Sequence, residues 1–189
     1  MKEKILLHCC CGCCAGGVVE DLKARGYDVI AFFCNPNIQP KQEYLKRKEA
    51  LMKILSEAGI ECFDGFVDEL YDEESSGWEE LVKGLENEPE GGKRCELCFE
   101  IRLRETAKAA KTLGIRSFAS TLAISPHKNA EMINRIGSRI AAEYRLKFIA
   151  DDFKQDNGFG KTMNIARKHS IYRQSYCGCR LSMPKSNKN

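Results

Sequence analysis

The stretch ILLHCCCGCCAGGVVEDLKARGYDVIAFF, residues 5–33, contains the pattern that decides the fold. Ile5–Leu7 and Val29–Phe33 are short apolar runs of the length and composition of β-strands. Between them, Val18–Arg25 has helical spacing and ends at Gly26, a residue typical of helix C-termini. Strand, helix and strand in this order predict a right-handed βαβ unit of a parallel sheet.

The same alternation continues along the chain. Further helices are predicted at Lys41–Ala58, in the acidic stretch Trp78–Glu88, at Leu97–Leu113, and after the N-cap pair Ser125-Pro126. Further strands are predicted at Glu61–Phe66, Arg116–Leu122 and Lys147–Ala150. With no internal repeat or linker evident, we predict a single α/β domain over residues 1–189, Rossmann-like (HUP-like), with a mostly parallel sheet and helices on both faces.

Composition narrows the class of protein. The chain has 189 residues, of which 43% are hydrophobic, enough for one sizeable core. No stretch approaches the ~20 apolar residues that span a bilayer, and the apolar run Ile5–Leu7 is too short for a signal peptide. We therefore expect a cytoplasmic protein with no membrane partner.

Charge is unevenly distributed, although the formal net charge is only +3. Residues 61–90 carry twelve Asp and Glu against one Lys, whereas the segment 145–189 carries ten Lys and Arg against three Asp. This basic C-terminal segment is typical of a surface that meets a polyanion such as nucleic acid, or simply of a well-solvated region.

Eleven cysteines are many for a reducing compartment, and clustered thiols there hold metal or perform redox chemistry. They form a run and two pairs: Cys9, Cys10, Cys11, Cys13 and Cys14; Cys95 and Cys98; Cys177 and Cys179. Neighbouring cysteines tend to point apart, which favours an iron–sulfur cluster over a single zinc ion without excluding zinc. Cys34 and Cys62 fit as small core residues.

Cys177-Gly178-Cys179 differs from the metal-binding patterns. A disulfide between residues two apart closes a small strained ring, and strained disulfides are the labile or catalytic ones. Gly178 supplies the backbone freedom that this ring requires. A redox-active pair is favoured, with two free thiols or two additional metal ligands as the alternatives.

The predicted topology gathers these groups at one rim, because ligands of parallel sheets lie beyond the carboxyl ends of the strands. The segments that follow strands are the cysteine run, Cys34–Asn37, Ser125–His127 and Asp151-Asp152. A nucleotide-splitting enzyme would need a phosphate cradle such as S-G-G-x-D-S after the first strand, and residues 12–17 lack it. A thioredoxin-like enzyme would place its C-x-x-C early in the chain, whereas Cys95–Cys98 lies in the middle.

Several motifs, taken together, are specific enough to indicate a protein family. They are Leu7-His8-x-Cys10-Cys11-x-x-Cys14, Asn35-Pro36-Asn37-Ile38, Glu43-Tyr44 with Arg47, Arg94-Cys95-x-x-Cys98-Phe99 with Arg102, Thr121-Leu122 with Ser125-Pro126, Asp152-Phe153, and Tyr172-Arg173-Gln174-x-Tyr176-Cys177-Gly178-Cys179. With these motifs, the sequence resembles the epoxyqueuosine reductases of the QueH type from Leu6 to Ser182.

The resemblance implies a reaction and a set of cofactors. Such enzymes remove the epoxide oxygen of epoxyqueuosine at the wobble position of tRNA, the last step of queuosine synthesis, without cobalamin. The resemblance implies that Cys10, Cys11, Cys95 and Cys98 hold a 4Fe–4S cluster and that Cys177 and Cys179 form a redox-active pair. The partners implied are tRNA carrying epoxyqueuosine and an unidentified electron donor.

The opening cysteine run departs from the usual family pattern. Relatives commonly have Cys-Cys-Ala-Pro-Cys where this chain has Cys11-Gly12-Cys13-Cys14, preceded by an additional Cys9. The extra sulfurs leave the ligand set open. Cys14 or Cys13 replaces Cys11, or Cys9, Cys13 and Cys14 hold a second, mononuclear iron or zinc ion.

Proton donors and substrate contacts are the remaining candidates. Tyr172 and Asp152 join the cysteine pair as catalytic candidates, and substrate contacts are predicted for Asn35, Asn37, Tyr44, Lys161 and Arg173. Tyrosines stack on splayed RNA bases, and Lys and Arg contact phosphates. Two other functions remain open at this stage: a zinc-bound nucleic-acid-binding protein without catalysis, and a thiol–disulfide oxidoreductase.

Overall fold

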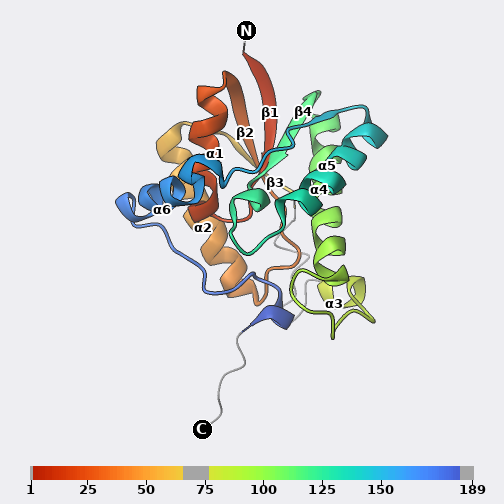
Figure 1. Ribbon diagram of the computed structural model, residues 1–189. Coiled ribbons are helices and arrows are strands. Elements are labelled where there is room, and N and C mark those ends of the chain that lie inside the picture. The colour runs from red at the N-terminus through yellow and green to blue at the C-terminus, as the bar shows by residue number, and fades with distance from the viewer. Residues whose placement is uncertain (1, 66–76, 184–189) are drawn as a thin grey trace.

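A five-stranded sheet forms the centre of the protein, whose computed structural model describes residues 2–65 and 77–183 (Figure 1). The strands are β1 (Glu3–His8), β2 (Tyr27–Phe33), β3 (Cys62–Asp64), β4 (Ser117–Ser120) and β5 (Lys147–Phe148). Their order is β3-β2-β1-β4-β5, and every pairing is parallel. The predicted α/β class with a parallel sheet is confirmed.

Strand β1 is the central strand. Its Leu7 is paired with Ala31 of β2 on one side and with Ala119 of β4 on the other. Because helices cover both faces, Ile5, Leu6 and Leu7 are all fully buried. This explains why β1 is a continuous apolar run rather than an alternating one.

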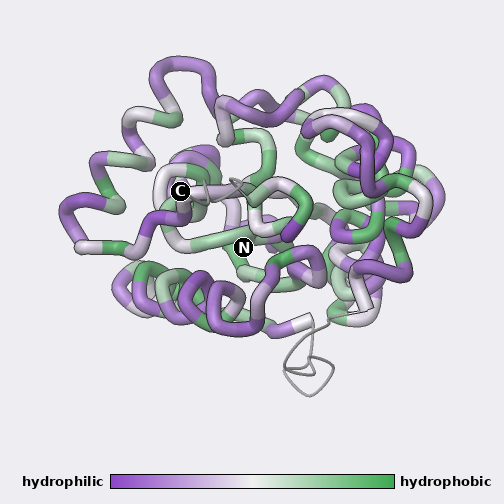
Figure 2. Tube along the Cα trace, turned by 90° about the horizontal axis from the view of Figure 1, so that it is seen from below, coloured by the Kyte–Doolittle hydropathy of each residue, from purple (hydrophilic) through white to green (hydrophobic). Residues whose placement is uncertain are grey.

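Helices cover both faces of the sheet, as predicted (Figure 1). One face carries α1 (Gly12–Ala24), α2 (Lys41–Ala58) and α6 (Gly158–Lys168), and the other carries α4 (Lys93–Thr112) and α5 (Ala130–Tyr144). Short turns complete the chain: α3 (Trp78–Leu81), η2 (Thr121–Ile124), η3 (Gln155–Asn157) and η4 (Arg180–Ser182). Figure 2 shows apolar segments inside and hydrophilic ones along the outer helices.

Several predicted boundaries are wrong in an informative way. Helix α1 begins at Gly12 instead of Val18, and α4 begins at Lys93 instead of Leu97, so both helices start within cysteine motifs. Helix α5 is capped by Asn129, whose side chain accepts a hydrogen bond from the Met132 amide, and not by Ser125. The acidic stretch is helical only at Trp78–Leu81, and α6 was not predicted at all. The end of the predicted strand Glu61–Phe66 lies outside the described residues.

The reversal of strand order determines where a site can form. From β1 the chain moves outward to β2 and β3 on one side, and later to β4 and β5 on the other. The carboxyl ends of β1 and β4 are therefore the topological switch point, where ligands of such sheets bind. The cysteine run follows β1 directly, and Thr121 follows β4. After α6 the chain returns below these strand ends toward α3 (Figure 1).

Among the described residues, no helix combines the length and the apolar character needed to cross a membrane.

Candidate metal and redox centre

Four cysteines gather at the switch point, and we call Cys10, Cys11, Cys13 and Cys14 the N-terminal sulfur group. The sulfurs of Cys10, Cys11 and Cys14 lie within 4.8 Å of one another, and all three residues are buried. The Sγ of Cys11 is 3.8 Å from that of Cys10 and 3.4 Å from that of Cys13. Because these residues flank the N-terminus of α1, its free backbone amides favour negatively charged sulfur.

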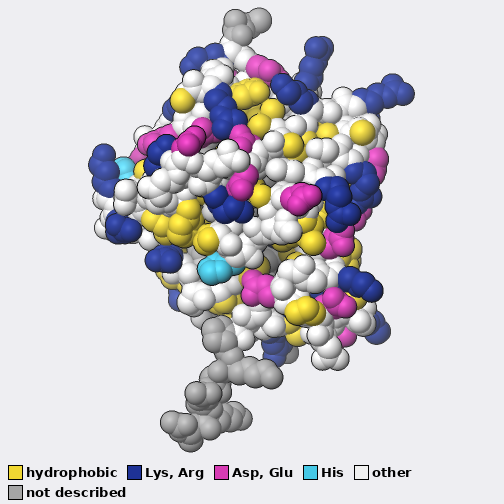
Figure 3. Space-filling model, in the orientation of Figure 1, with side chains coloured by type: hydrophobic (Ala, Val, Ile, Leu, Met, Phe, Trp, Pro, Cys, Tyr) yellow, Lys and Arg dark blue, Asp and Glu magenta, His cyan; other side chains and the backbone are white. Residues whose placement is uncertain are grey.

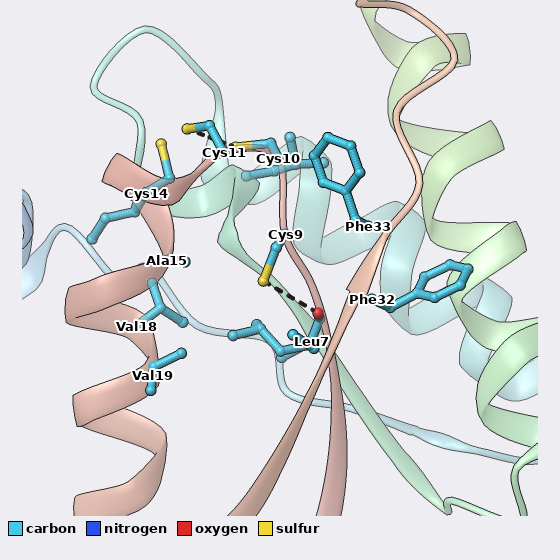
Figure 4. Packing of buried hydrophobic residues seen from close by; sticks show 14 of the residues in the cluster. Leu7, Cys9, Cys10, Cys11, Cys14, Ala15, Val18, Val19, Phe32 and Phe33 are labelled. Atoms are coloured by element: carbon cyan, nitrogen blue, oxygen red, sulfur yellow. Dashed lines mark hydrogen bonds between the residues drawn. The ribbon is translucent and has the colours of Figure 1, made fainter. Parts of the chain in front are cut away.

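Cys9 does not belong to this group. Its sulfur points in the opposite direction and donates a hydrogen bond to the Leu7 carbonyl oxygen at 3.4 Å (Figure 4). Cys9 is fully buried, and burial raises the pKa of its thiol well above the usual value. A neutral thiol directed into the core is a packing residue. The predicted second-metal set of Cys9, Cys13 and Cys14 is therefore not brought together by the structure.

Charge is shared within the N-terminal sulfur group. Hydrogen bonds from Cys10 and Cys13 lower the pKa of the Cys11 thiol well below its usual value. The hydrogen bond with Cys11 raises the pKa of the Cys13 thiol, and hydrogen bonds with Cys10, Cys11 and Cys13 raise the pKa of the Cys14 thiol. The thiols therefore titrate as a coupled set in which Cys11 is the favoured position of negative charge. A metal that replaces the thiol protons gains several thiolate ligands at once.

Gln174, from the segment after α6, closes this group on one side. Its Nε2 donates to the Cys11 sulfur at 3.1 Å, and its Oε1 accepts from the Cys13 thiol at 3.1 Å. On the other side, the Thr121 hydroxyl accepts from the Cys10 amide at 3.1 Å. The cysteine run is thus held by residues from both β4's end and the C-terminal segment.

The other two cysteine pairs form a second sulfur group, defined as Cys95, Cys98, Cys177 and Cys179. All four line one small cavity of about 30 Å³. Burial raises the pKa of the Cys98 thiol to about 12, and that of Cys95 is also raised by burial. The indole N–H of Trp78 donates to the Cys179 sulfur at 3.3 Å. Cys179 is buried, whereas Cys177 is half-buried.

Arg47 of α2 fixes the Cys177 turn. Its Nη1 donates to the Cys177 carbonyl and its Nη2 to the Tyr176 carbonyl, both at 3.0 Å. Its Nε is paired with Glu43 at 2.7 Å, so all three guanidinium nitrogens are occupied. Gly178 has φ = 113°, and a Cβ there would lie 2.9 Å from Arg47 Nη1. Only glycine fits this turn without strain.

A larger cavity of about 570 Å³ adjoins both sulfur groups. Cys10, Cys13 and Cys14 line it from one group, and Cys177 lines both this cavity and the small one. Its basic lining residues are Arg47, Arg102, His127, Lys128 and Arg173. Glu90 is the only carboxylate that lines it from the described part of the chain. The cavity therefore presents sulfur and positive charge together.

Arg102 lies between the two sulfur groups. Its Nε donates to the Cys98 carbonyl and its Nη1 to the Asn35 side-chain oxygen, both at 3.3 Å. Asn35 in turn donates to the Cys9 carbonyl at 2.9 Å. Arg102 is 2% exposed, and its Nη2 has no hydrogen-bond partner among the described residues. Two hydrogen bonds thus link the cysteine run to α4 and leave one buried N–H free.

The structure distributes the other predicted site residues widely. Arg173 lines the large cavity. Tyr172 donates to Glu43 Oε2 at 2.7 Å, and Asn37 is fully buried with neither amide atom paired among the described residues. Tyr44 is fully buried against Phe33, with ring centroids 5.0 Å apart, so it presents no face to a base. Asp152 and Lys161 line a separate cavity of about 330 Å³.

Sequence reasoning missed several cavity residues. Gln174, Arg47 and Arg102 stand within the quoted motifs, yet no role was assigned to them. Lys128 lines both cavities and also escaped notice. Electrostatic interaction with the nearby sulfurs of Cys177, Cys10 and Cys14 outweighs burial and raises the pKa of the Lys128 ammonium. A polar residue inside a cysteine-bearing motif is the signal that would have identified Arg102 and Gln174, whereas the motif of Arg47 contains no cysteine.

The fold and the site define a class: a Rossmann-like α/β protein with two thiol groups around a cation-lined cavity at the switch point of its sheet. The profile of the Epoxyqueuosine reductase QueH family matches residues 5–185. The chain belongs to this family, and the resemblance drawn from the motifs is confirmed. Neither a zinc-bound nucleic-acid-binding protein nor a general thiol–disulfide oxidoreductase is favoured by this membership.

Relatives from three bacteria illustrate the match. Proteins named Epoxyqueuosine reductase QueH are 39% identical in Acinetobacter baylyi, over 98% of this chain and 83% of that protein, and 38% identical in Streptococcus pyogenes, over 95% and 70%. The relative in Thermotoga maritima is 37% identical, over 95% of this chain and 90% of its own.

A solved structure supports the fold. The U34-tRNA thiolase NcsA from Methanococcus maripaludis, solved with its 4Fe-4S cluster, has a TM-score of 0.59 and 16% sequence identity. The alignment covers 97% of this chain, which spans 62% of that longer protein. At this identity the likeness shows a common architecture and nothing about shared chemistry.

Proposed function

We propose that this protein reduces epoxyqueuosine to queuosine at the wobble position of tRNA. The reaction consumes two electrons and two protons, breaks both C–O bonds of the epoxide, forms a carbon–carbon double bond and releases water. The observation that carries the proposal is the large cavity, which both sulfur groups line. Family membership indicates the substrate. The cavity is the place where that substrate would contact cysteine sulfurs and positively charged side chains.

We assign a 4Fe–4S cluster to Cys10, Cys11 and Cys14. These residues fit such a group because three buried sulfurs converge and because a cavity adjoins two of them. When bound there, the cluster supplies electrons one at a time. The set inferred from the family resemblance instead pairs Cys10 and Cys11 with Cys95 and Cys98. Those last two residues line the small cavity with Cys177 and Cys179, which favours the revised assignment.

Cys177 and Cys179 are proposed as a pair that stores two electrons. The structure supports different roles for the two thiols, since Cys177 lines both cavities and Cys179 is buried against Trp78. A second candidate is a mononuclear iron or zinc site formed by the whole second sulfur group. Four cysteines line one small cavity, and thiolate sets of this size bind such ions. Their sulfurs would have to draw together to do so, because among the described residues only Cys10, Cys11 and Cys14 bring three ligand atoms within 4.8 Å of one another. Metal bound by Cys177 and Cys179 would exclude their redox cycle.

Protons come from a group that lines the large cavity. Tyr172 and Asp152, predicted as donors, do not line it. Lys128 does, and its ammonium is charged in the field of the surrounding sulfurs. We therefore place the first proton transfer, to the epoxide oxygen, at Lys128 Nζ.

The tRNA would reach the cavity through its open side, where Arg173 is exposed. Figure 3 shows Lys and Arg side chains spread over the margins of this face, with acidic and apolar side chains between them. The basic side chains of the face drawn in Figure 3 are scattered, and each one that contacts a phosphate would contribute to tRNA binding. Lys161 remains a predicted phosphate contact at the neighbouring cavity. The electron donor and the predicted cytoplasmic location remain open predictions.

Anaerobic turnover on epoxyqueuosine-containing tRNA tests the function. Protein reconstituted with iron and sulfide, given dithionite, is expected to form queuosine. Cys10→Ser is expected to lose the cluster's visible absorption and at least 100-fold in turnover, because one ligand is missing. Cys62→Ser, outside both sulfur groups, serves as the matched control. Full turnover by Cys10→Ser would contradict the assignment, and no turnover by the iron-loaded wild type would contradict the function.

Cys95→Ser and Cys98→Ser separate the two versions of the ligand set. Under the revised assignment both variants keep four irons in the cluster and its absorption. Loss of that absorption in either variant would restore Cys95 and Cys98 as cluster ligands. Zinc and iron quantitation on the same variants decides whether the second sulfur group holds a metal ion.

A further inference from the structure

Charged side chains are unevenly distributed in the lining of the large cavity. Its lining holds five basic residues and one carboxylate, Glu90, which also lines the small cavity. Glu90 is exposed, whereas Arg102 is 2% exposed and carries the free Nη2. One end of the cavity therefore offers an accessible negative charge, and the interior offers a buried N–H without a partner.

A buried donor without a partner is costly, because a lost hydrogen bond leaves the group neither hydrated nor paired. Of the described residues that line the cavity, only Arg102 has a buried side-chain nitrogen or oxygen in this condition. Arg47 also lines the cavity, but all its nitrogens are engaged. Arg102 thus lines the cavity and carries a buried N–H group that lacks an acceptor among the described residues.

The proposed substrate carries complementary groups. Its cyclopentane ring bears a secondary amine, protonated at neutral pH, on the carbon next to the epoxide. The epoxide oxygen is a hydrogen-bond acceptor that gains negative charge when a C–O bond breaks. Cation and acceptor are only a few bonds apart, so one cavity of this size accommodates both.

Resting on the proposed function, we propose that Glu90 and Arg102 orient the substrate by charge. The Glu90 carboxylate binds the secondary ammonium, and Arg102 Nη2 donates a hydrogen bond to the epoxide oxygen. The reacting carbons are then held beside Cys177 and the N-terminal sulfur group. As the C–O bond breaks, its electron pair stays on the oxygen, and the Arg102 hydrogen bond strengthens before a proton reaches that oxygen.

Binding of three anticodon stem-loops to the iron-loaded protein tests the orientation. The stem-loops carry epoxyqueuosine, queuosine or unmodified guanine at the wobble position. Glu90→Gln is expected to weaken binding of both modified forms about fivefold, as removal of a partly exposed ion pair does. Binding of the guanine form is expected to stay unchanged, since it has no amine. The exposed helix residue variant Glu49→Gln is the matched control.

Arg102→Lys tests the other contact, with Arg104→Lys on the same helix as its control. Wild-type protein is expected to bind the epoxide form more tightly than the alkene form, and Arg102→Lys is expected to lose that preference. Its turnover is expected to fall about 100-fold, the usual cost of one lost oxyanion donor. The iron content and the guanine stem-loop affinity are expected to remain at wild-type values.

Three outcomes would overturn the inference. Equal weakening of all three stem-loops by Glu90→Gln would assign Glu90 to the RNA backbone or the fold. Loss of iron from Arg102→Lys would show that Arg102 serves the sulfur groups instead. An unchanged preference for the epoxide form would remove Arg102 from the oxygen. Failure of the wild type to reduce the epoxide form would instead refute the function itself.

Discussion

The N-terminal sulfur group lies at the end of the central strand, where Cys11 is 1% and Cys13 3% exposed. The second sulfur group draws two cysteines from the start of α4 and two from the segment after α6, and its Cys95 and Cys177 are half-buried. The first group is positioned mainly by the sheet and by α1, and Gln174 of the C-terminal segment only covers it. The second exists only when a distant segment docks, through Arg47 and Trp78. Local changes should therefore damage the two groups independently.

The substitution expected to affect the two sulfur groups most differently is Gly12→Ala. A Cβ at Gly12 would lie 2.4 Å from the Ala50 backbone oxygen, so α1 must move away from α2. Because backbone cannot rotate aside, we expect a loss of about 3 kcal/mol in the free energy of unfolding. Urea denaturation and iron content measure the result, and thiol counts on the second sulfur group should stay unchanged.

Gly160→Ala is the control for this variant. A Cβ there meets only the side chain of Asn157, which can rotate away. We expect wild-type stability and iron content. Normal iron content in Gly12→Ala would contradict the view that the approach of α1 to α2 positions the N-terminal sulfur group.

A smaller effect is expected from acid, acting beside the N-terminal sulfur group. Burial and the Arg102 charge lower the pKa of His8 to about 3, from 6.5. In this neutral form Nε2 donates to the Cys34 carbonyl and Nδ1 accepts from the Ser120 hydroxyl. The unfolded chain takes up a proton below pH 6.5, so stability falls as pH drops from that value toward 3.

Urea denaturation of the metal-free protein at pH 7.5 and pH 5 measures this contribution, which we expect to be about 2 kcal/mol. His8→Asn should flatten the difference by that amount. His127→Asn, an exposed histidine variant, should leave the difference intact. Equal pH dependence in all three proteins would show that His8 ionises as freely in the folded chain as in the unfolded one.

The smallest effect is expected from Trp78→Phe, which alters only the second sulfur group. The indole N–H loses its contact with Cys179, and we expect a loss of about 1 kcal/mol, the worth of one hydrogen bond. Alkylation of Cys179 should become faster, as followed by mass spectrometry. The iron content of the N-terminal sulfur group should not change, and a parallel loss of iron would contradict the independence of the two groups.

Much of the fold was predictable, because short apolar runs predicted all five strands and their alternation with helices as far as α5. The start of α1 at Gly12 was not, since cysteines and glycines are weak helix formers and no capping side chain marks the start. That start depends on the fit of Gly12 against α2, a tertiary contact. Likewise Ser125-Pro126 has the composition of a cap, but Asn129 accepts the capping hydrogen bond.

The site was predictable as a set of cysteines but not as two groups. Spacing shows that Cys95 and Cys98 turn to the same side, yet it does not show which other sulfurs they meet. The turn of Cys9 into the core, away from Cys10, is invisible in a run of identical residues. Asp152 follows a predicted strand but lines a neighbouring cavity, because the sheet edge at β5 lies away from the switch point.

Gln174 covers sulfurs that precede it by as many as 163 residues. A ribosome therefore exposes the cysteine run long before the side chain that covers it has been made. During synthesis, the N-terminal thiols are open to iron delivery and to oxidation alike. Gln174 ends that interval when its segment docks, so the sulfurs are accessible during synthesis before their cover is in place.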